Sequence, residues 1–325
     1  MSDSTRIAGP FAPILTPFSP DRSVIDHDSF RQHLAFIEDA GLAGVLVLGT
    51  NGEFTQLTID ERLQLIDVTL SAGTGLKIII GVTVPDSPDR TLAFMEQMTV
   101  YAGELTAVLV APPFYNRYTD GNEVSSAEVV VFYRQLSKVQ DRIPVFLYNV
   151  PVPPDGRTTA AVTPDMVAEL ESDPIFAGIK DSTARLENIP AYLGTRSNFQ
   201  VLLGSDHIIA EGLSLGAVGS ITACGNVFPG AVRAVYAAQP GPDLELAQVE
   251  LTALRRILEV VPGKAVAIQK LLLFLQGIVE YQSPVREAQR ELTDPEKDVV
   301  LGKLSEAAEG LRLNRDLAEA ILRQL

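Results

Sequence analysis

The chain has 325 residues, of which 46% are hydrophobic and 21% charged, and its formal net charge is −15. This composition is typical of a folded globular protein, and the excess of acidic groups argues against nucleic acid as a partner, because like charges repel. The single cysteine, Cys224, excludes an internal disulfide, and the three histidines lack metal-ligand spacing, so we expect no metal and no cofactor.

Short apolar runs recur along the first two thirds of the chain. Each has about five to seven residues rich in Val, Ile or Leu, which is typical of strands buried on both faces. The predicted strands are Phe11–Leu15, Gly44–Leu48, Lys77–Val82, Ala107–Ala111, Pro144–Val150, Phe176–Lys180, Gln200–Gly204 and Gly219–Ala223.

Amphipathic stretches lie between these runs and predict helices. Several begin after a capping residue: Asp28, Thr58 with Glu61 three residues later, and Thr163 ahead of Pro164. The predicted helices include Ser29–Ala40, Thr58–Ser71, Pro88–Tyr101, Ser126–Val139 and Thr163–Glu171. This alternation predicts an α/β fold, a closed (β/α)₈ TIM barrel, although an open doubly wound sheet has the same order of elements.

After Pro229 the strand signals stop and four helical stretches follow, at Ala231–Gln239, Leu244–Val260, Ala265–Val279 and Pro295–Gln324. We interpret residues 1–240 as the catalytic barrel and 241–325 as a helical extension packed on it. The most apolar stretch, Ala265–Val279, contains Lys270 and two glutamines and is too short to span a bilayer. With no signal-peptide pattern at the start, we expect a cytoplasmic protein with no membrane partner.

Reactive groups of such barrels lie at the C-terminal ends of the strands. There the sixth predicted strand ends in Lys180, next to Asp181. A lysine in a buried strand is unusual, because removing an ammonium group from water costs free energy. The same cost favours the neutral amine, which attacks ketones. The plainer interpretation is a lysine paired with Asp181 at the barrel rim.

Two other strand ends carry groups that suit the same chemistry. The turn Gly49-Thr50-Asn51-Gly52 offers backbone N–H groups, a hydroxyl and an amide, which can bind a carboxylate, although a glycine-rich turn is often only a turn. Tyr148 ends the fifth predicted strand and can transfer protons, unless it is simply a core residue. Amine, proton donor and carboxylate cradle together point to a 2-oxo acid.

These motifs, in this order, resemble the dihydrodipicolinate synthase and N-acetylneuraminate lyase superfamily of pyruvate-dependent class I aldolases. The resemblance extends from Gly9 to about Leu301. It rests on the segments Gly49–Glu53, Phe114–Asn116, Tyr148–Pro151, Gly178–Thr183, Gly204–Asp206 and Gly219–Asn226.

The resemblance implies a role for each matching residue. Lys180 would form the imine with pyruvate, and Tyr148 would be the acid and base. Thr50 would relay protons between Tyr148 and Tyr115, the latter reaching in from a neighbouring subunit. Asn51, Gly52 and the backbone at Thr50 would hold the pyruvate carboxylate, and the carbonyl of Ile221 would line the pocket. A homotetramer built as a dimer of dimers is implied as well.

Two departures from the family pattern leave the second substrate open. Position 51 is Asn where the synthases usually carry Thr, which resembles aldolases of 4-hydroxy-2-oxoglutarate or 2-keto-3-deoxy sugar acids. Four residues, Val152–Asp155, appear inserted before Gly156-Arg157-Thr158, so Arg157 is either the displaced substrate-binding arginine or an exposed loop residue.

We therefore expect a Schiff-base lyase or aldolase that acts on pyruvate and an aldehyde. Condensation with aspartate semialdehyde, as in dihydrodipicolinate synthase, is favoured slightly over the other aldolases or a dehydratase. A non-catalytic keto-acid-binding relative is the alternative from another class. A barrel for phosphorylated substrates fits poorly, because Asp206 would repel phosphate after the seventh predicted strand.

Overall fold

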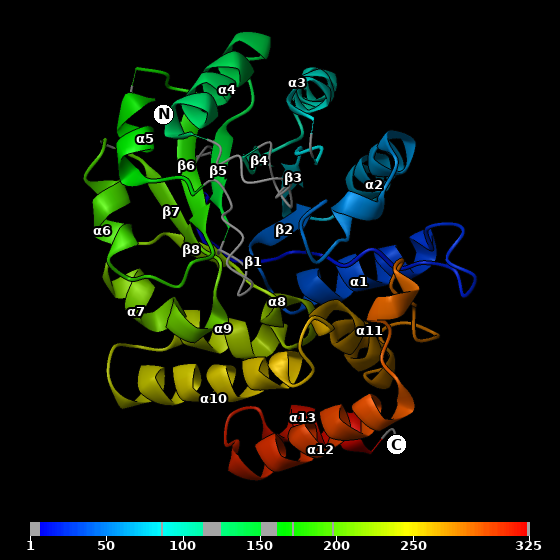
Figure 1. The fold of residues 1–325 in the computed structure, drawn as a ribbon. Helices are drawn as coiled ribbons and strands as arrows, with labels where there is room; N and C mark the ends of the chain where they lie inside the picture. The colour runs from blue at the N-terminus through cyan, green and yellow to red at the C-terminus, as the bar shows by residue number, and fades with distance from the viewer. Residues whose placement is uncertain are drawn as a thin grey trace. The chain divides into compact units, whose positions relative to one another are not determined.

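A computed structural model describes residues 7–85, 87–112, 125–150, 161–170, 172–196 and 198–323. Its eight strands form a closed barrel in chain order, β1 to β8 (Figure 1). The predicted (β/α)₈ barrel with C-terminal helices is confirmed, and the open-sheet alternative is wrong. The strands are β1 (Gly9–Ala12), β2 (Gly44–Val47), β3 (Lys77–Gly81), β4 (Ala107–Val110), β5 (Val145–Asn149), β6 (Phe176–Asp181), β7 (Gln200–Leu203) and β8 (Gly219–Ile221).

Helices follow the strands and continue after the last one. They are α1 (His27–Asp39), α2 (Ile59–Ser71), α3 (Pro88–Gln97), α4 (Ser126–Val139), α5 (Pro164–Glu169), α6 (Asn188–Leu193), α7 (Ile209–Ser214), α8 (Cys224–Val227), α9 (Pro229–Ala237), α10 (Pro242–Glu259), α11 (Ala265–Leu275), α12 (Asp294–Gly310) and α13 (Arg315–Leu322). Two predicted caps are confirmed: Thr58 forms a capping box with Glu61, and Thr163 caps α5. The prediction for Asp28 is wrong, because the carboxylate of Asp26 caps α1.

The chain divides into two compact units. Unit 1 comprises Met1–Gly9 and Lys77–Ile221, and unit 2 comprises Pro10–Leu76 and Thr222–Leu325. Each unit contains residues that the sequence predicts to be functional, with Tyr148 and Lys180 in unit 1 and Thr50 and Asn51 in unit 2. The boundary near residue 240 between a catalytic domain and an extension stays a prediction.

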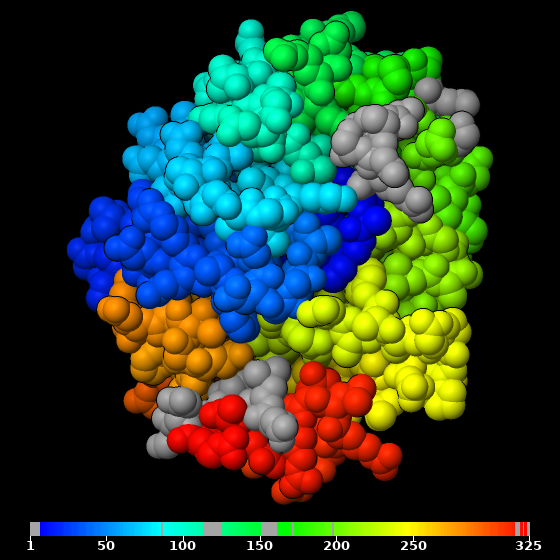
Figure 2. Space-filling view, turned by 180° about the vertical axis from the view of Figure 1, so that it is seen from behind, coloured from blue at the N-terminus to red at the C-terminus, as the bar shows by residue number. Residues whose placement is uncertain are grey.

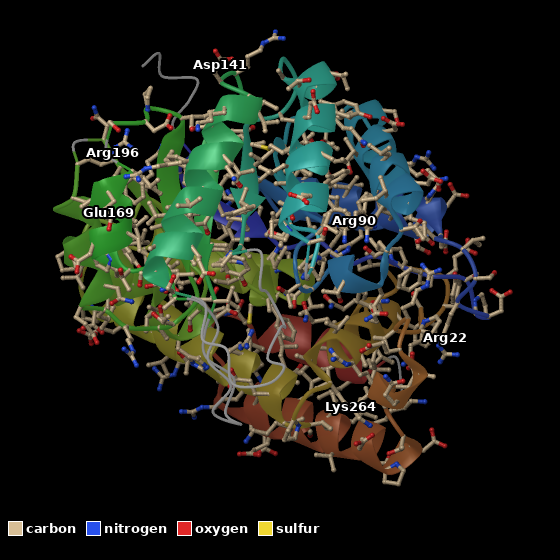
Figure 3. The ribbon with its side chains drawn as sticks, turned by 45° about the horizontal axis from the view of Figure 1, so that its top comes forward. Arg22, Arg90, Asp141, Glu169, Arg196 and Lys264 are labelled. Carbon is tan, nitrogen blue, oxygen red and sulfur yellow. The ribbon has the colours of Figure 1, made fainter. Side chains whose placement is uncertain are left out.

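Unit 1 contains the strands β3 to β8, which pair in parallel with their neighbours. Nearly every strand residue is buried, as the continuous apolar runs predict. The helices α4 to α7 lie along the outer side of β5–β8 in Figure 1. Charged side chains lie on the outer helices of this unit, with Arg90 on α3, Asp141 just after α4 and Glu169 at the end of α5 (Figure 3).

Unit 2 joins the beginning of the chain to its end. β1 pairs in parallel with β2, and α10 packs against α9 and α12. The segment 281–291 lies against residues 17–30, orange beside blue in Figure 2. Two hydrogen bonds fix this contact, since the hydroxyl of Tyr281 binds Asp26 at 2.8 Å and the amide of Phe18 binds Ser283 at 2.7 Å.

The predicted last helix, Pro295–Gln324, is in fact two helices, α12 and α13. The chain leaves the helix between them because the buried carboxylate of Glu250 binds backbone N–H groups there. It accepts hydrogen bonds from Arg312, Leu313 and Asn314, at 2.6 to 3.0 Å. A distant carboxylate thus satisfies amides that a continuous helix would have paired internally.

Candidate active site

Two neighbouring strands of unit 1 bring Tyr148 and Lys180 together. In the parallel pair of β5 and β6, Tyr148 is the register partner of Lys180. The side chains therefore share one face, and Lys180 Nζ lies 4.4 Å from the centroid of the Tyr148 ring. Lys180 is 5% exposed and Tyr148 is 8% exposed. A nearly buried amine beside a phenol ring is thus positioned by the sheet itself.

Close packing of β6 explains why Gly178 precedes this lysine. A Cβ at position 178 would collide with the carbonyl oxygen of Gln200 and with the ring of Phe146. A glycine here lets the three neighbouring strands approach closely. The segment Gly178–Lys180 is therefore fixed by backbone packing as well as by pairing.

Asp181 does not pair with Lys180, so the plainer interpretation of this lysine is wrong. Alternation along β6 turns the Asp181 carboxylate to the opposite face. There it accepts hydrogen bonds from the Asn149 amide at 3.2 Å, the Thr183 backbone at 2.9 Å and the Asn188 amide at 2.8 Å. Among the residues that the structure describes, no carboxylate forms an ion pair with Lys180.

The Asp181 contacts continue into a buried polar network that fixes the ends of β5 and β6. Asn149 also donates to the Tyr192 hydroxyl at 3.1 Å and accepts from the Val162 amide at 3.1 Å. The Tyr192 hydroxyl in turn donates to the carbonyl of Val162. Burial, and then the charge of Asp181, raise the pKa of Tyr192, so this phenol stays protonated. The network is structural support that the sequence analysis missed.

In unit 2, the turn Gly49–Glu53 follows β2 and carries the predicted carboxylate cradle. Thr50 is exposed, Asn51 is half-buried and Gly52 is buried. The Gly52 carbonyl accepts a hydrogen bond from the Thr16 hydroxyl at 2.7 Å, and a Cβ on Gly52 would come within 3.0 Å of the Ile14 carbonyl oxygen. Gly52 is thus needed for close packing of the turn, in addition to any role toward a ligand.

The last residue of this turn is held by a lysine that the sequence analysis did not consider functional. Lys270 Nζ lies 2.6 Å from the Glu53 carboxylate, and Lys270 is 2% exposed. Burial lowers the pKa of Lys270, and the Glu53 carboxylate opposes that shift. A signal was available, since this lysine interrupts the most apolar stretch of the chain.

Of the remaining predicted site residues, the structure describes one, Ile221. Ile221 ends β8 in unit 1 and is buried, as expected for a residue that lines a barrel. Tyr115 and Arg157 lie outside the described residues. Among the described residues, no group of three His, Cys, Asp or Glu side chains could hold a metal ion. No described helix is both long and apolar enough to cross a membrane.

Comparison with known proteins shows which family this chain belongs to. The model of the dihydrodipicolinate synthetase family matches residues 6–300. The chain belongs to this family. An uncharacterized DapA-like lyase of Chloroflexus aurantiacus is 31% identical over 252 residues, which cover 76% of this chain and 80% of the relative. A 4-hydroxy-tetrahydrodipicolinate synthase of Methanospirillum hungatei is 30% identical over 243 residues, 74% of this chain and 79% of the relative.

Solved structures of the family share the fold. YagE, a prophage protein of E. coli K12 solved in complex with pyruvate, has a TM-score of 0.79 at 25% identity, and the match covers 93% of this chain and 98% of YagE. The dihydrodipicolinate synthase of Thermotoga maritima has a TM-score of 0.78 at 26% identity, with the same coverage. Family membership makes this chain a lyase of that family, and leaves its substrates to be proposed.

Proposed function

We propose that this protein is a class I lyase that forms an imine between Lys180 and pyruvate or a related 2-oxo acid. The observation that carries the proposal is the position of Lys180. It lies nearly buried at the end of β6, with its Nζ 4.4 Å from the Tyr148 ring and with no ion-pair partner among the described residues. An amine in this position can add to a ketone carbon and form an imine, which is the chemistry that a class I lyase uses.

The proposed reaction begins when the neutral Lys180 nitrogen adds to the ketone carbon of pyruvate. The carbinolamine then loses water, and an iminium forms. The iminium withdraws electrons, so a proton leaves the adjacent methyl carbon and an enamine results. The enamine carbon attacks the aldehyde carbonyl, a C–C bond forms, and water releases the product from Lys180. Cleavage follows the same steps in reverse.

Tyr148 is the proposed acid and base at this centre. It would protonate the carbinolamine hydroxyl as water leaves and take up protons in the reverse direction. Following the family pattern, we propose that Thr50 relays protons between Tyr148 and Tyr115. Tyr115 would come from a neighbouring subunit. Support for Tyr148 comes from its register with Lys180 on the neighbouring strand.

Asn51, Gly52 and the backbone of Thr50 are proposed to bind the pyruvate carboxylate, and the Ile221 carbonyl to line the pocket. Amide and hydroxyl donors at a turn suit a carboxylate, because such donors can satisfy its oxygens. The anchoring of this turn by Thr16 and Lys270 supports the assignment, since a binding group must be held in place.

For the second substrate, condensation with aspartate semialdehyde is the first candidate and cleavage of 4-hydroxy-2-oxoglutarate or a 2-keto-3-deoxy sugar acid is the second. The named synthase among the relatives supports the first. Asn51 and the inserted residues before Arg157 favour the second. A dehydratase that works through the same imine is a further form of this proposal.

The imine is tested by incubating the protein with pyruvate and sodium borohydride and mapping the adduct by mass spectrometry. One reduced pyruvate adduct on Lys180 is expected. Its absence would favour the non-catalytic keto-acid-binding alternative and would end the enzyme proposal. Assays with aspartate semialdehyde, glyoxylate and small sugar aldehydes then identify the partner. Native mass spectrometry tests the proposed homotetramer, and cell fractionation tests the proposed cytoplasmic location.

A further inference from the structure

A cluster of charged residues in unit 2 holds the turn Gly49–Glu53; we call Glu53, Glu61, Lys270 and Arg286 the turn-anchoring cluster. Lys270 comes from α11, 217 residues away from Glu53 along the chain, and its Nζ donates to Glu53 Oε1 at 2.6 Å and to the Pro284 carbonyl at 2.7 Å. At 2% exposure, this is a buried ion pair.

The second oxygen of Glu53 is engaged as well. Glu53 Oε2 accepts from the backbone N–H of Arg286 at 2.8 Å, and the Arg286 guanidinium binds Glu61, at the start of α2, at 2.6 Å. Both cations also lie over the Phe18 ring, at 4.6 Å for Lys270 and 4.9 Å for Arg286. The segment from Lys270 to Arg286 therefore binds both the turn and α2, the helix that follows it.

The backbone conformation at the ends of the turn requires stabilising contacts of this kind. Leu48 and Glu53, one at each end, adopt left-handed conformations, with φ of 60° and 54°. Non-glycine residues reach this region at a cost of roughly 1–2 kcal/mol each, so the surroundings must stabilise it. At Glu53 the stabilising contacts are those made by Lys270 and by the Arg286 backbone.

Charge gives Lys270 a second effect. Glu53 lies two residues after Asn51, which is proposed to bind a carboxylate. A bare buried carboxylate at position 53 would repel an anionic substrate, and the repulsion is strong where water is scarce. The ammonium group of Lys270 neutralises Glu53 at 2.6 Å and prevents this repulsion.

We propose that Lys270 and Glu53 are positioning residues that hold the turn in its substrate-binding form and keep its potential suited to an anion. This inference rests on the proposed function, because it assumes that the turn binds the pyruvate carboxylate. Residues near the C-terminus would thereby contribute to the affinity for pyruvate. Loss of Lys270 should weaken pyruvate binding, while Lys180 still forms the imine.

The test measures the borohydride-trapping rate as a function of pyruvate concentration in K270M, K270M/E53Q and the matched control K264M. Lys264 stands at the start of the same helix and forms an ion pair of the same length, 2.6 Å, with Glu296. K270M is expected to raise the half-saturating pyruvate concentration about tenfold, equivalent to about 1.4 kcal/mol. The double variant is expected within about threefold of the wild type and K264M unchanged, since neither leaves a bare carboxylate in the turn.

A purely structural role would give another result. It would lower the amount of adduct, which reports the folded fraction, without changing the half-saturating concentration, and that outcome would overturn the proposal. If K270M does not fold, E53Q, which keeps the acceptor oxygen, is compared with E53A, which removes it. A tenfold rise in E53A alone supports the proposal, and equal values overturn it. Failure to trap wild-type protein instead refutes the proposed function, and this inference with it.

Discussion

Two lysines of this chain are almost equally buried, yet their surroundings differ completely. Lys180, at 5% exposure, has the face of Tyr148 as its neighbour and no ion-pair partner among the described residues. Lys270, at 2% exposure, has the Glu53 carboxylate at 2.6 Å and the Pro284 carbonyl at 2.7 Å. Lys270 is thus held by an ion pair and a hydrogen bond, whereas Lys180 has a ring face beside it and no ion pair among the described residues.

The difference teaches that burial alone does not identify a reactive lysine. A buried ammonium group needs an anion and hydrogen-bond acceptors, and Lys270 has both. Lys180 even has an aspartate as its neighbour in sequence, but Asp181 faces the other side of β6 and binds Asn149, Thr183 and Asn188. A buried strand-end lysine that has no ion pair with a carboxylate is therefore a better candidate for imine formation than a buried lysine that has one.

The largest effect is expected from removing the amine. K180M should lower turnover by at least about 10⁴-fold, because it removes the amine that is proposed to form the covalent intermediate. The borohydride adduct should disappear, while circular dichroism shows a folded protein. K264M serves as a control that also loses one lysine and should keep full activity. An adduct that forms on K180M at another lysine would contradict the role of Lys180.

Removing the phenol should have a smaller effect than removing the amine. Y148F keeps the ring beside Lys180 but loses the proton donor, so kcat should fall about 10²- to 10³-fold while the adduct still forms slowly. Y192F is the matched control. Its hydroxyl belongs to the Asn149 network, so its loss should lower the free energy of unfolding by about 1–2 kcal/mol and leave kcat near the wild-type value. Equal kcat losses in the two variants would contradict the assignment.

The same methionine substitution at the other lysine should affect stability. K270M strands a buried carboxylate, so the free energy of unfolding should fall by about 3–5 kcal/mol, as measured by urea titration. K270M/E53Q should recover part of this loss, because no charge is left unpaired. K180M should stay within about 1 kcal/mol of the wild type, since it breaks no ion pair among the residues that the structure describes. A similar loss in K180M and K270M would remove the contrast between the two lysines.

The sequence sufficed to predict the elements that depend on local patterns. Apolar runs located all eight strands to within a few residues, and the capping residues Thr58 and Thr163 marked true helix starts. Position at a strand end was enough to select Lys180 and Tyr148. That their side chains share a face depends on strand register, which became known only from the paired backbone.

What the sequence could not supply are contacts between distant segments. Lys270 and Glu53 are separated by 217 residues, and Glu250 reaches the break after α12 across more than sixty residues. No local pattern reports such partners, so the predicted single last helix was wrong. The reverse holds for Asp181, where nearness in sequence suggested a salt bridge that strand alternation rules out.

His33 is a third buried titratable group, and among the described residues no carboxylate contacts it. His33 in α1 lies near Asn226, whose carbonyl oxygen is 3.1 Å from His33 Nε2. Burial lowers the pKa of His33 from its usual value of 6.5 to about 4. The unfolded chain therefore binds a proton between these values and the folded one does not, so acid favours unfolding in that window.

Stability should accordingly be complete above pH 6.5 and decrease as the pH falls toward 4. At pH 5 the loss that depends on His33 should be about 2 kcal/mol relative to pH 7. Urea titrations of the wild type and H33Q at both pH values isolate this term, because the other titrating groups are common to the two proteins. If H33Q loses as much stability between pH 7 and pH 5 as the wild type, His33 is not the group that titrates. The contrast between Lys270, whose buried charge is paired with Glu53, and His33, whose pKa is lowered by burial, would then lose its support.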